Sequence, residues 1–280
     1  MSLFSNTAID LIERVHRILT KDWKGGTCTG GGASTFADTA RTEPDDYFQN
    51  TVPVSKVTIW STTDGAAPQG QERTISDWVV STGTGTVSAA WTTANPASGD
   101  KYAIMSEYGL QEILHAINDA IEAVRGKGLV DRVDESVVLV SSVYEYAIPD
   151  GFTHIHTLSM ADDTGQYGQS IPPDAYIIVR SSVTPKIKFL LYPSFNVSSA
   201  VEHAGLWAES GLTAGRILRI EGYGYQNSLV NYTDLCVLNP MYVAWQAAAF
   251  LHANRITRID TEPSGHQAQY QACQMVANEF

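Results

Sequence analysis

The residues that come nearest to a phosphate-binding loop are 25–32, which read Gly-Gly-Thr-Cys-Thr-Gly-Gly-Gly. A P-loop needs Gly-Lys followed by Ser or Thr at the start of a helix. Here the glycines follow an expected helix and lead into a β-type segment, so we predict a flexible hinge. A nucleophilic thiol needs a neighbouring base. The sequence places none beside Cys28.

A metal site could be built on one strand. His154 and His156 are two residues apart, so both side chains lie on the same face of an extended segment. A third ligand would have to come from elsewhere, with His203 or Glu202 as candidates. A half-exposed strand explains the pair equally simply, and we predict no metal site.

Acidic residues offer two further kinds of chemistry. The neighbouring pairs Asp45-Asp46 and Asp162-Asp163 could bind a hard cation, but calcium loops place their carboxylates at alternate positions. We therefore predict solvated loop acids. A glycosidase needs two carboxylates at a fixed separation, and nothing in the sequence fixes the separation of the candidates Glu202, Glu209 and Asp174.

Aromatic residues could stack against sugars, but in β-rich domains they more often fill the core. No Gly-x-Ser-x-Gly nucleophile motif is present. We therefore predict no catalytic, metal-binding or cofactor-binding residue and no enzymatic activity. The tryptophans considered for a sugar platform are Trp78, Trp91, Trp207 and Trp245.

Composition excludes several function classes. The chain has 280 residues, with 18 basic and 30 acidic side chains and a formal net charge of −12. A DNA-binding surface needs clustered basic residues, and none are clustered here. The three cysteines form no CxxC pair and their odd number excludes a full disulfide framework. No apolar run approaches the ~20 residues that span a bilayer. We expect synthesis in a host cytoplasm and no membrane contact.

Two periodicities alternate along the chain. Apolar residues recur every three or four positions over 7–23 and 106–124, which predicts amphipathic helices. Thr7 with Asp10 resembles a capping box, and Ser106 is a candidate cap for the second helix. Further helices are expected over 241–252, where Asn239 and Pro240 start the helix, and over 266–278. The segments between the helices, 25–104 and 134–225, carry short β-type runs separated by turn residues.

Neither of the first two helices can bury its apolar stripe alone. We therefore predict an α+β fold, an antiparallel helical bundle core with two inserted β domains of small barrel or sandwich type. The core would comprise residues 1–24, 105–133 and 234–280. The inserted β domain would be 25–104 and the second β domain 134–233.

The first β segment resembles a small β domain of tailed-bacteriophage structural proteins. Residues 38–48 carry the acid-Pro-Asp-Tyr turn of that family, within Glu-Pro-Asp-Asp-Tyr. Residues 70–77 read Gly-Gln-Glu-Arg-Thr-Ile-Ser-Asp, and 85–87 read Gly-Thr-Val. Residues 96–104 close the pattern with Pro-Ala-Ser-Gly-Asp-Lys-Tyr-Ala-Ile.

The rest of the chain is similar to head-to-tail adaptor proteins, also called neck or connector proteins. Residues 118–121 read Asn-Asp-Ala-Ile, and 144–151 read Tyr-Glu-Tyr-Ala-Ile-Pro-Asp-Gly. Residues 219–223, Arg-Ile-Glu-Gly-Tyr, and the Ala-rich helix after Pro240 match the closing half of that family. The individual motifs are short, and their succession along most of the chain carries the resemblance.

This resemblance implies a virion structural protein of the neck, between the portal vertex and the tail. It would form a homo-oligomeric ring of twelve copies that docks under the portal protein and extends the DNA channel. The ring would offer the attachment surface to a tail, tail-terminator or nozzle protein. Genomic DNA would pass without specific binding, because an acidic lining repels phosphate.

The C-terminal end offers candidate contact residues. Met275, Val276 and Phe280 form an apolar C-terminal end, which we predict to contact the portal or a neighbouring subunit. The alternative function is a tail-associated carbohydrate- or receptor-binding structural module, motivated by the Gly/Thr-rich segment and the tryptophans. A β-sandwich hydrolase using Glu202, Glu209 and Asp174 is the third hypothesis.

Overall fold

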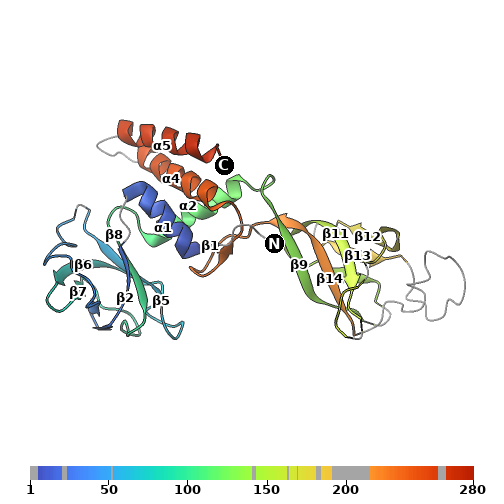
Figure 1. Ribbon diagram of the computed structural model, residues 1–280, viewed down its shortest axis with the longest axis horizontal. Coiled ribbons are helices and arrows are strands. Elements are labelled where there is room, and N and C mark those ends of the chain that lie inside the picture. The colour runs from blue at the N-terminus through green and yellow to red at the C-terminus, as the bar shows by residue number, and fades with distance from the viewer. Residues whose placement is uncertain are drawn as a thin grey trace, which may run out of the picture. The chain divides into compact units, whose positions relative to one another are not determined.

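The computed structural model describes residues 6–20, 24–51, 53–140, 143–162, 164–168, 170–180, 184–190, 215–257 and 263–280 (Figure 1). The chain divides into two compact units. Unit 1 comprises Met1–Val124 and Ser228–Phe280, and unit 2 comprises Arg125–Asn227. The predicted division into three parts remains a prediction. None of the described helices is long and apolar enough to cross a membrane.

Four α-helices are described in unit 1. They are α1 (Ala8–Thr20), α2 (Leu110–Ala123), α4 (Pro240–Thr257) and α5 (Pro263–Ala277). Helix α4 lies between α5 and the pair α1 and α2 (Figure 1), and its alanines are buried where the helices approach. Ala244, Ala247 and Ala248 are fully covered, which explains the Ala-rich sequence of this helix.

Two of the predicted helix starts are confirmed. The Thr7 backbone N–H donates to Asp10 Oδ2 at 3.0 Å and the Asp10 N–H donates to Thr7 Oγ1 at 3.3 Å, as in a capping box. The Met241 N–H donates to Asn239 Oδ1 at 2.9 Å. Ser106 does not cap α2, because that helix begins only after Gly109, whose backbone is extended.

The predicted fold class, an antiparallel helical bundle core with inserted β domains, is wrong. Most of the regular structure in the described residues is antiparallel β-sheet, and the four helices are short, with 13 to 18 residues each. An apolar stripe requires an apolar partner, but the partner need not be a helix. Here non-helical residues complete the helix core, namely Ala103, Met105, Tyr108, Leu229, Tyr232 and Cys236.

A seven-stranded antiparallel sheet forms the β part of unit 1, in the order β2-β8-β5-β6-β7-β4-β3. Its edge strands β2 and β3 are consecutive in the chain and only Cys28 and Thr29 separate them. The Cys28 N–H donates to the Asp100 carbonyl at 2.7 Å, and the Thr29 N–H donates to the Ala37 carbonyl at 2.7 Å. One continuous stretch thus pairs with β8 and then with β4, so the sheet closes on itself. Its strands are β2 (Lys24–Thr27), β3 (Gly30–Gly32), β4 (Thr35–Ala37), β5 (Lys56–Ser61), β6 (Glu72–Val79), β7 (Thr84–Val87) and β8 (Lys101–Met105).

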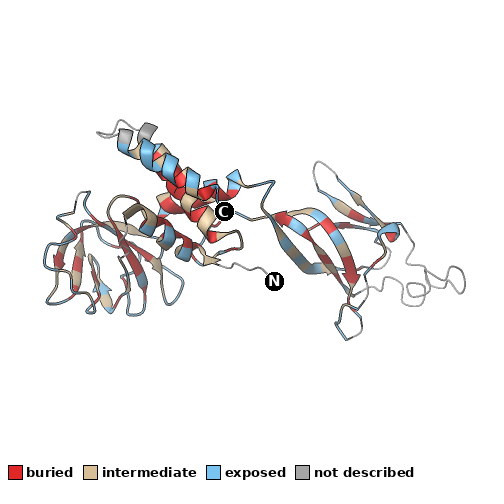
Figure 2. Cartoon of the chain, turned by 45° about the horizontal axis from the view of Figure 1, so that its top comes forward, coloured by how far each residue is buried: buried red, intermediate tan, exposed pale blue. Residues whose placement is uncertain are grey.

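The glycines expected to form a hinge lie in these strands instead. Gly26 in β2 pairs with Tyr102 in β8, and Gly31 in β3 pairs with Phe36 in β4. The closed sheet surrounds a separate apolar core, which includes Phe36, Phe48, Trp78 and Tyr102. In Figure 2 the strands of this sheet carry buried segments interrupted by less buried ones along their length. A short pair, β1 (Asn6–Thr7) with β15 (Leu235–Cys236), joins the chain before α1 to the segment before α4.

Unit 2 is formed by two three-stranded antiparallel sheets. One has the order β11-β14-β9, and the other β10-β13-β12. Inward side chains of both sheets, such as Leu218, Ile155 and Ile187, form one apolar core. The strands are β9 (Leu129–Val138), β10 (Glu145–Ala147), β11 (Phe152–Met160), β12 (Tyr176–Val179), β13 (Lys186–Phe189) and β14 (Ile217–Tyr225), with a 3-10 turn, η1, at Pro173–Ala175.

Candidate functional site

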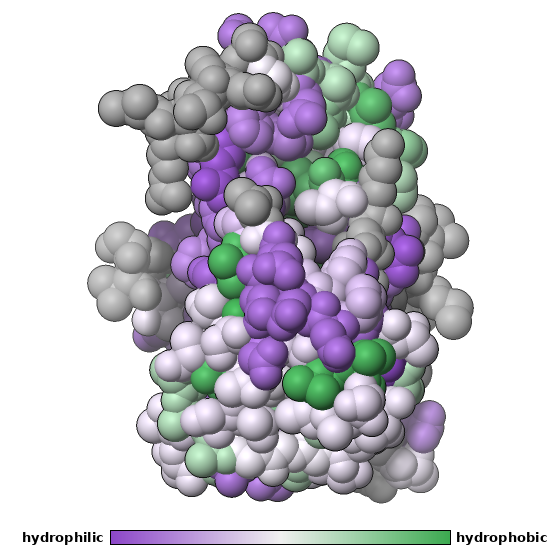
Figure 3. Space-filling view, turned by 90° about the vertical axis from the view of Figure 1, so that its left-hand side faces the viewer, coloured by the Kyte–Doolittle hydropathy of each residue, from purple (hydrophilic) through white to green (hydrophobic). Residues whose placement is uncertain are grey.

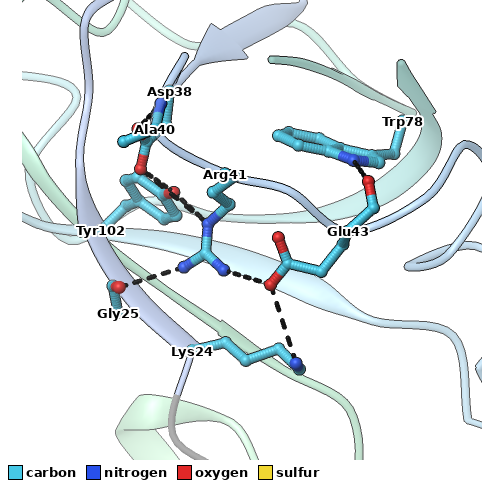
Figure 4. Close-up of polar contacts among 8 residues, drawn as sticks. All are labelled: Lys24, Gly25, Asp38, Ala40, Arg41, Glu43, Trp78 and Tyr102. Atoms are coloured by element: carbon cyan, nitrogen blue, oxygen red, sulfur yellow. Dashed lines mark hydrogen bonds and ion pairs between the residues drawn. The ribbon is translucent and has the colours of Figure 1, made fainter. Parts of the chain in front are cut away.

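A group of hydrogen-bonded polar side chains in unit 1 surrounds Arg41 (Figure 4). Its guanidinium Nε donates to the Tyr102 hydroxyl, Nη1 donates to Glu43 Oε1 at 2.8 Å, and Nη2 donates to the Gly25 carbonyl at 3.0 Å. Tyr102 in turn donates to Asp38 Oδ2 at 2.6 Å. Each charged group therefore meets a partner of opposite charge or a hydrogen-bonding group, as buried charges require.

The loop after β4 is fixed to the sheet by this cluster. Trp78 Nε1 in β6 donates to the Glu43 carbonyl at 3.0 Å, and the Val80 N–H donates to Asp45 Oδ1 at 2.7 Å. Lys24 Nζ lies 3.7 Å from Glu43 Oε1. The acid-Pro-Asp-Tyr turn is thus held at several points along its length. Its polar residues position the loop.

Burial raises the pKa of two groups in this region, Tyr102 and Cys28. Burial raises the pKa of Tyr102 well above its usual range, although the Arg41 charge opposes the change. Burial, together with Asp100 and Asp38, raises the pKa of the Cys28 thiol to about 12. Neither group would supply an anion near neutral pH, and a thiolate is the nucleophilic form of cysteine. The nucleophile considered at Cys28 is therefore not supported by its surroundings.

Polar residues of the other β-domain motifs also contact their own domain. Gln71 accepts from the Thr92 N–H at 2.9 Å, and Arg73 Nε donates to the Ala90 carbonyl at 3.1 Å. Arg73 also lies 5.6 Å above the Trp91 ring. Asp100 accepts from the backbone N–H groups of Thr63 at 3.0 Å and Ala97 at 2.8 Å. These motif residues stabilise turns and strand ends.

In unit 2, two motifs that are distant in sequence meet. Gly151 follows the Ile-Pro turn with a φ of +95°, and its carbonyl oxygen would lie 1.8 Å from a Cβ placed on Gly224. A Cβ on Gly222 would lie 2.0 Å from the His154 carbonyl oxygen. Arg132 crosses these glycines and donates to Asn227 Oδ1 at 2.8 Å. The glycines are required because the strands and the Arg132 side chain leave no room for a methyl group.

The remaining sequence candidates are not brought together. His154 and His156 are both exposed on β11, and no cluster of three or more metal-ligating side chains exists among the described residues. Asp162 accepts from the Thr164 and Gln166 backbone N–H groups within a turn, and Asp174 is exposed in η1. Glu202, His203, Trp207, Glu209 and Asp163 lie outside the described residues. Trp78 and Trp91 are buried, and Trp245 is half-buried in α4.

The predicted C-terminal contact residues lie at the end of α5 and just beyond it. Met275 is 70% exposed and Phe280 is 55% exposed, whereas Val276 is half-buried. Cys273 and Ala277, on the opposite side of the helix, are buried against the helix core. Two large apolar side chains are thus open to a partner. The face of the molecule in Figure 3, by contrast, carries hydrophobic residues only in small separate areas.

One polar pair was not anticipated from the sequence. His252 in α4 and His266 in α5 have their Nδ1 atoms 3.1 Å apart, and Tyr108 packs edge-on against His252. Burial, and then the His266 charge, lower the pKa of His252 to about 4. The pair joins α4 to α5. Because the two histidines are fourteen residues apart and lie on different helices, no local sequence pattern predicts their contact.

Comparison with known proteins identifies no family. No family model matches the chain, and no curated protein matches it significantly. The interpretation of its function therefore depends on the residues and their contacts. Most polar motif residues are bonded inside their own unit, and the apolar side chains left exposed lie on outer surfaces.

Proposed function

We propose that this protein is a virion structural protein of a tailed bacteriophage, a head-to-tail adaptor without catalytic activity. It would dock under the portal protein as a ring of twelve copies. It would extend the DNA channel and provide the attachment surface for the tail, tail-terminator or nozzle protein. The resemblance of its motifs to adaptor proteins supports this proposal.

The observation that carries the proposal is that motif segments distant in sequence contact each other. The Ile-Pro-Asp-Gly turn packs at Gly151 against Gly224, which directly follows the Arg-Ile-Glu-Gly-Tyr run in β14, and Phe152 pairs in register with the same glycine. Asp38 of the first β-domain motif likewise meets Tyr102 of the last. Packing and hydrogen bonding explain why these residue types are present, and no reacting group is needed to explain them. This favours a scaffold protein over a hydrolase.

The tail-associated carbohydrate-binding alternative has less support. It depended on tryptophans that could stack against sugars, but Trp78 and Trp91 are 0% and 6% exposed. Their indole N–H groups donate to backbone carbonyls of Glu43 and Thr35. A stacking platform needs an accessible ring face.

The proposal is tested by portal binding of the full chain. We expect a portal pull-down to retain the protein, and Met275→Glu or Phe280→Glu to weaken retention about tenfold, because a charge would be desolvated in the contact. Gln267→Glu adds the same charge to an exposed position of α5 and is the matched control. Point substitutions are preferable to deleting residues 265–280, because the deletion would also remove buried Cys273 and Ala277.

A second measurement tests the role in assembly. Particles produced without this protein should be filled heads that lack tails when viewed by electron microscopy. Normal tailed particles, or a wild-type protein that the portal does not retain, would contradict the proposed function.

A further inference from the structure

The two sheets of unit 2 present two different outward faces. Both sheets turn apolar side chains toward one core, so the alternate side chains of each sheet point away from the core. The outward faces therefore lie on opposite sides of the same unit. Both faces expose large apolar residues, and the net charges of the two faces have opposite signs.

The first outward face belongs to sheet β11-β14-β9, and we call it the acidic face. Val133 is 54% exposed, Leu129 is 44% exposed and Tyr223 is 40% exposed. The only cation in the group defined here is Arg219, whose Nε lies 2.8 Å from Glu221 Oε1 and 3.7 Å from Glu135 Oε1. Asp131 pairs in register with Tyr223 and adds a third carboxylate. The face comprises Leu129, Asp131, Val133 and Glu135 of β9 and Arg219, Glu221 and Tyr223 of β14, and the exposed His154 and His156 of β11 lie beside Tyr223.

The second outward face belongs to sheet β10-β13-β12, and we call it the basic face. Its residues form two rows across the strands, Glu145–Lys188–Ile177 and Ala147–Lys186–Val179. Both lysines approach the single carboxylate of Glu145, at 3.2 Å from Lys186 and 3.7 Å from Lys188. Ile177 and Val179 are 43% and 38% exposed. One positive charge therefore exceeds the negative charge.

We propose that the acidic face of one copy binds the basic face of a second copy, so that unit 2 joins neighbouring subunits head to tail. The apolar rows would pack together while Lys186 and Lys188 approach the carboxylates of the neighbour. A contact between two different faces leaves each copy with one free face, and such heterologous contacts generate a closed ring when the rotation between neighbours closes and an open filament when it does not. The inference deepens the proposed adaptor function and rests on it, because it names one contact between ring neighbours.

The size of the faces predicts a weak contact. Four residue positions along each of three strands cover an area of roughly 13 by 14 Å at the usual strand spacings. This is far below the ~800 Å² per partner that stable interfaces bury. We therefore expect subunits to associate through this contact mainly when a docking platform or further contacts hold them together. A covalent trap is the suitable assay, because it captures a weak but specific encounter.

Disulfide trapping of the full chain tests the proposal. The native cysteines Cys28, Cys236 and Cys273 are buried, so new surface cysteines can be followed on a non-reducing gel. We expect a mixture of Val133→Cys and Ile177→Cys chains to form the mixed dimer about tenfold more than Val230→Cys with Ile177→Cys. Val230 is 75% exposed in unit 1 and makes a matched control.

Charge reversal supplies the second variant. Lys186→Glu combined with Lys188→Glu on the Ile177→Cys chain should reduce the mixed dimer to the control level. Adding Asp131→Lys and Glu221→Lys to the Val133→Cys chain should restore it. An unchanged melting temperature establishes that each variant is folded. A mixed dimer no more abundant than the control, Val133→Cys homodimers in excess, or no effect of charge reversal would overturn the head-to-tail contact.

The two proposals fail separately. Portal retention with no mixed dimer would leave the adaptor function intact and remove the proposed contact. A specific mixed dimer without portal retention would establish self-association and contradict the adaptor function.

Discussion

Tyr102 in β8 donates a 2.6 Å hydrogen bond to the carboxylate of Asp38, which lies 64 residues earlier in the chain. The same hydroxyl accepts a hydrogen bond from Arg41. One phenolic oxygen therefore connects the charges of Asp38 and Arg41 to the sheet. This contact fixes the loop after β4 against the last strand of the closed sheet.

Removing this hydroxyl should destabilise the protein without a change of fold. We expect Tyr102→Phe to lower the free energy of unfolding by about 2–3 kcal/mol, because it leaves buried charged groups with fewer hydrogen bonds. Urea denaturation measures the change. Tyr47→Phe is the control, since Tyr47 is 37% exposed. Equal stability of the two variants would show that the cluster contributes little.

The close packing beside this cluster makes a second prediction. A Cβ on Gly26 would lie 2.6 Å from both Asp38 Oδ2 and the Tyr102 hydroxyl. We expect Gly26→Ala to cost about 1–3 kcal/mol, because these atoms are held by their hydrogen bonds and yield little. Gly265→Ala in α5, where a Cβ would meet nothing within 4 Å, should be neutral or stabilising. Thermal denaturation of both variants measures the change in stability. A Gly26→Ala variant as stable as the wild type would contradict the close packing around Gly26.

The histidine pair predicts a pH dependence. His252 has a pKa of about 4 in the folded protein, below the ~6.5 of an unfolded histidine. As the pH falls below 6.5 the unfolded state binds a proton that the folded state does not, so stability decreases by at most about 3 kcal/mol down to pH 4. The groups facing His252 are Tyr108 and His266, with Arg255 over the Tyr108 ring.

The free energy of unfolding measured between pH 7 and pH 4 tests this dependence. Carboxylates also contribute over this range, so variants must be compared. His252→Gln should lose less stability on acidification than the wild type, whereas His115→Gln, at an exposed position of α2, should follow the wild type. Parallel curves for wild type and His252→Gln would exclude the histidine as the source.

The adaptor proposal also predicts poor binding of duplex DNA by the free protein. With a net charge of −12 and no clustered basic residues in the sequence, few phosphates can be neutralised. A gel shift at physiological salt should show no retained complex, and any complex at low salt should disappear as salt is added. A tight complex at physiological salt would contradict the proposed passive channel.

Structure could be predicted from the sequence where the interacting residues are close together in the chain. The capping contacts of Thr7 and Asn239 were evident because the partners lie within three residues. Strands β12 and β14 lie within short β-type runs that the sequence predicts as strands. The glycines of β2 and β3 were misassigned to a hinge because their strand character comes from pairing with β8 and β4.

The architecture and the polar cluster required tertiary information. The stripes of α1 and α2 showed that each helix is buried, but not that Met105 and Tyr232 complete their core. This gap produced the wrong bundle prediction. Asp38, Arg41 and Tyr102 were recognised as motif residues, yet their mutual contact spans about sixty residues, and no spacing rule reports such a contact.

The pairing of Lys24 with Ile104 places the first and last strands of the closed sheet side by side. The chain therefore leaves the helical layer and returns to it at almost the same point, after some eighty residues with a core of their own. The segment therefore has the form of an insertion that folds around its own residues. Ala103 and Met105 in its last strand also belong to the helix core, so this strand couples the stability of the insertion to that of the helices.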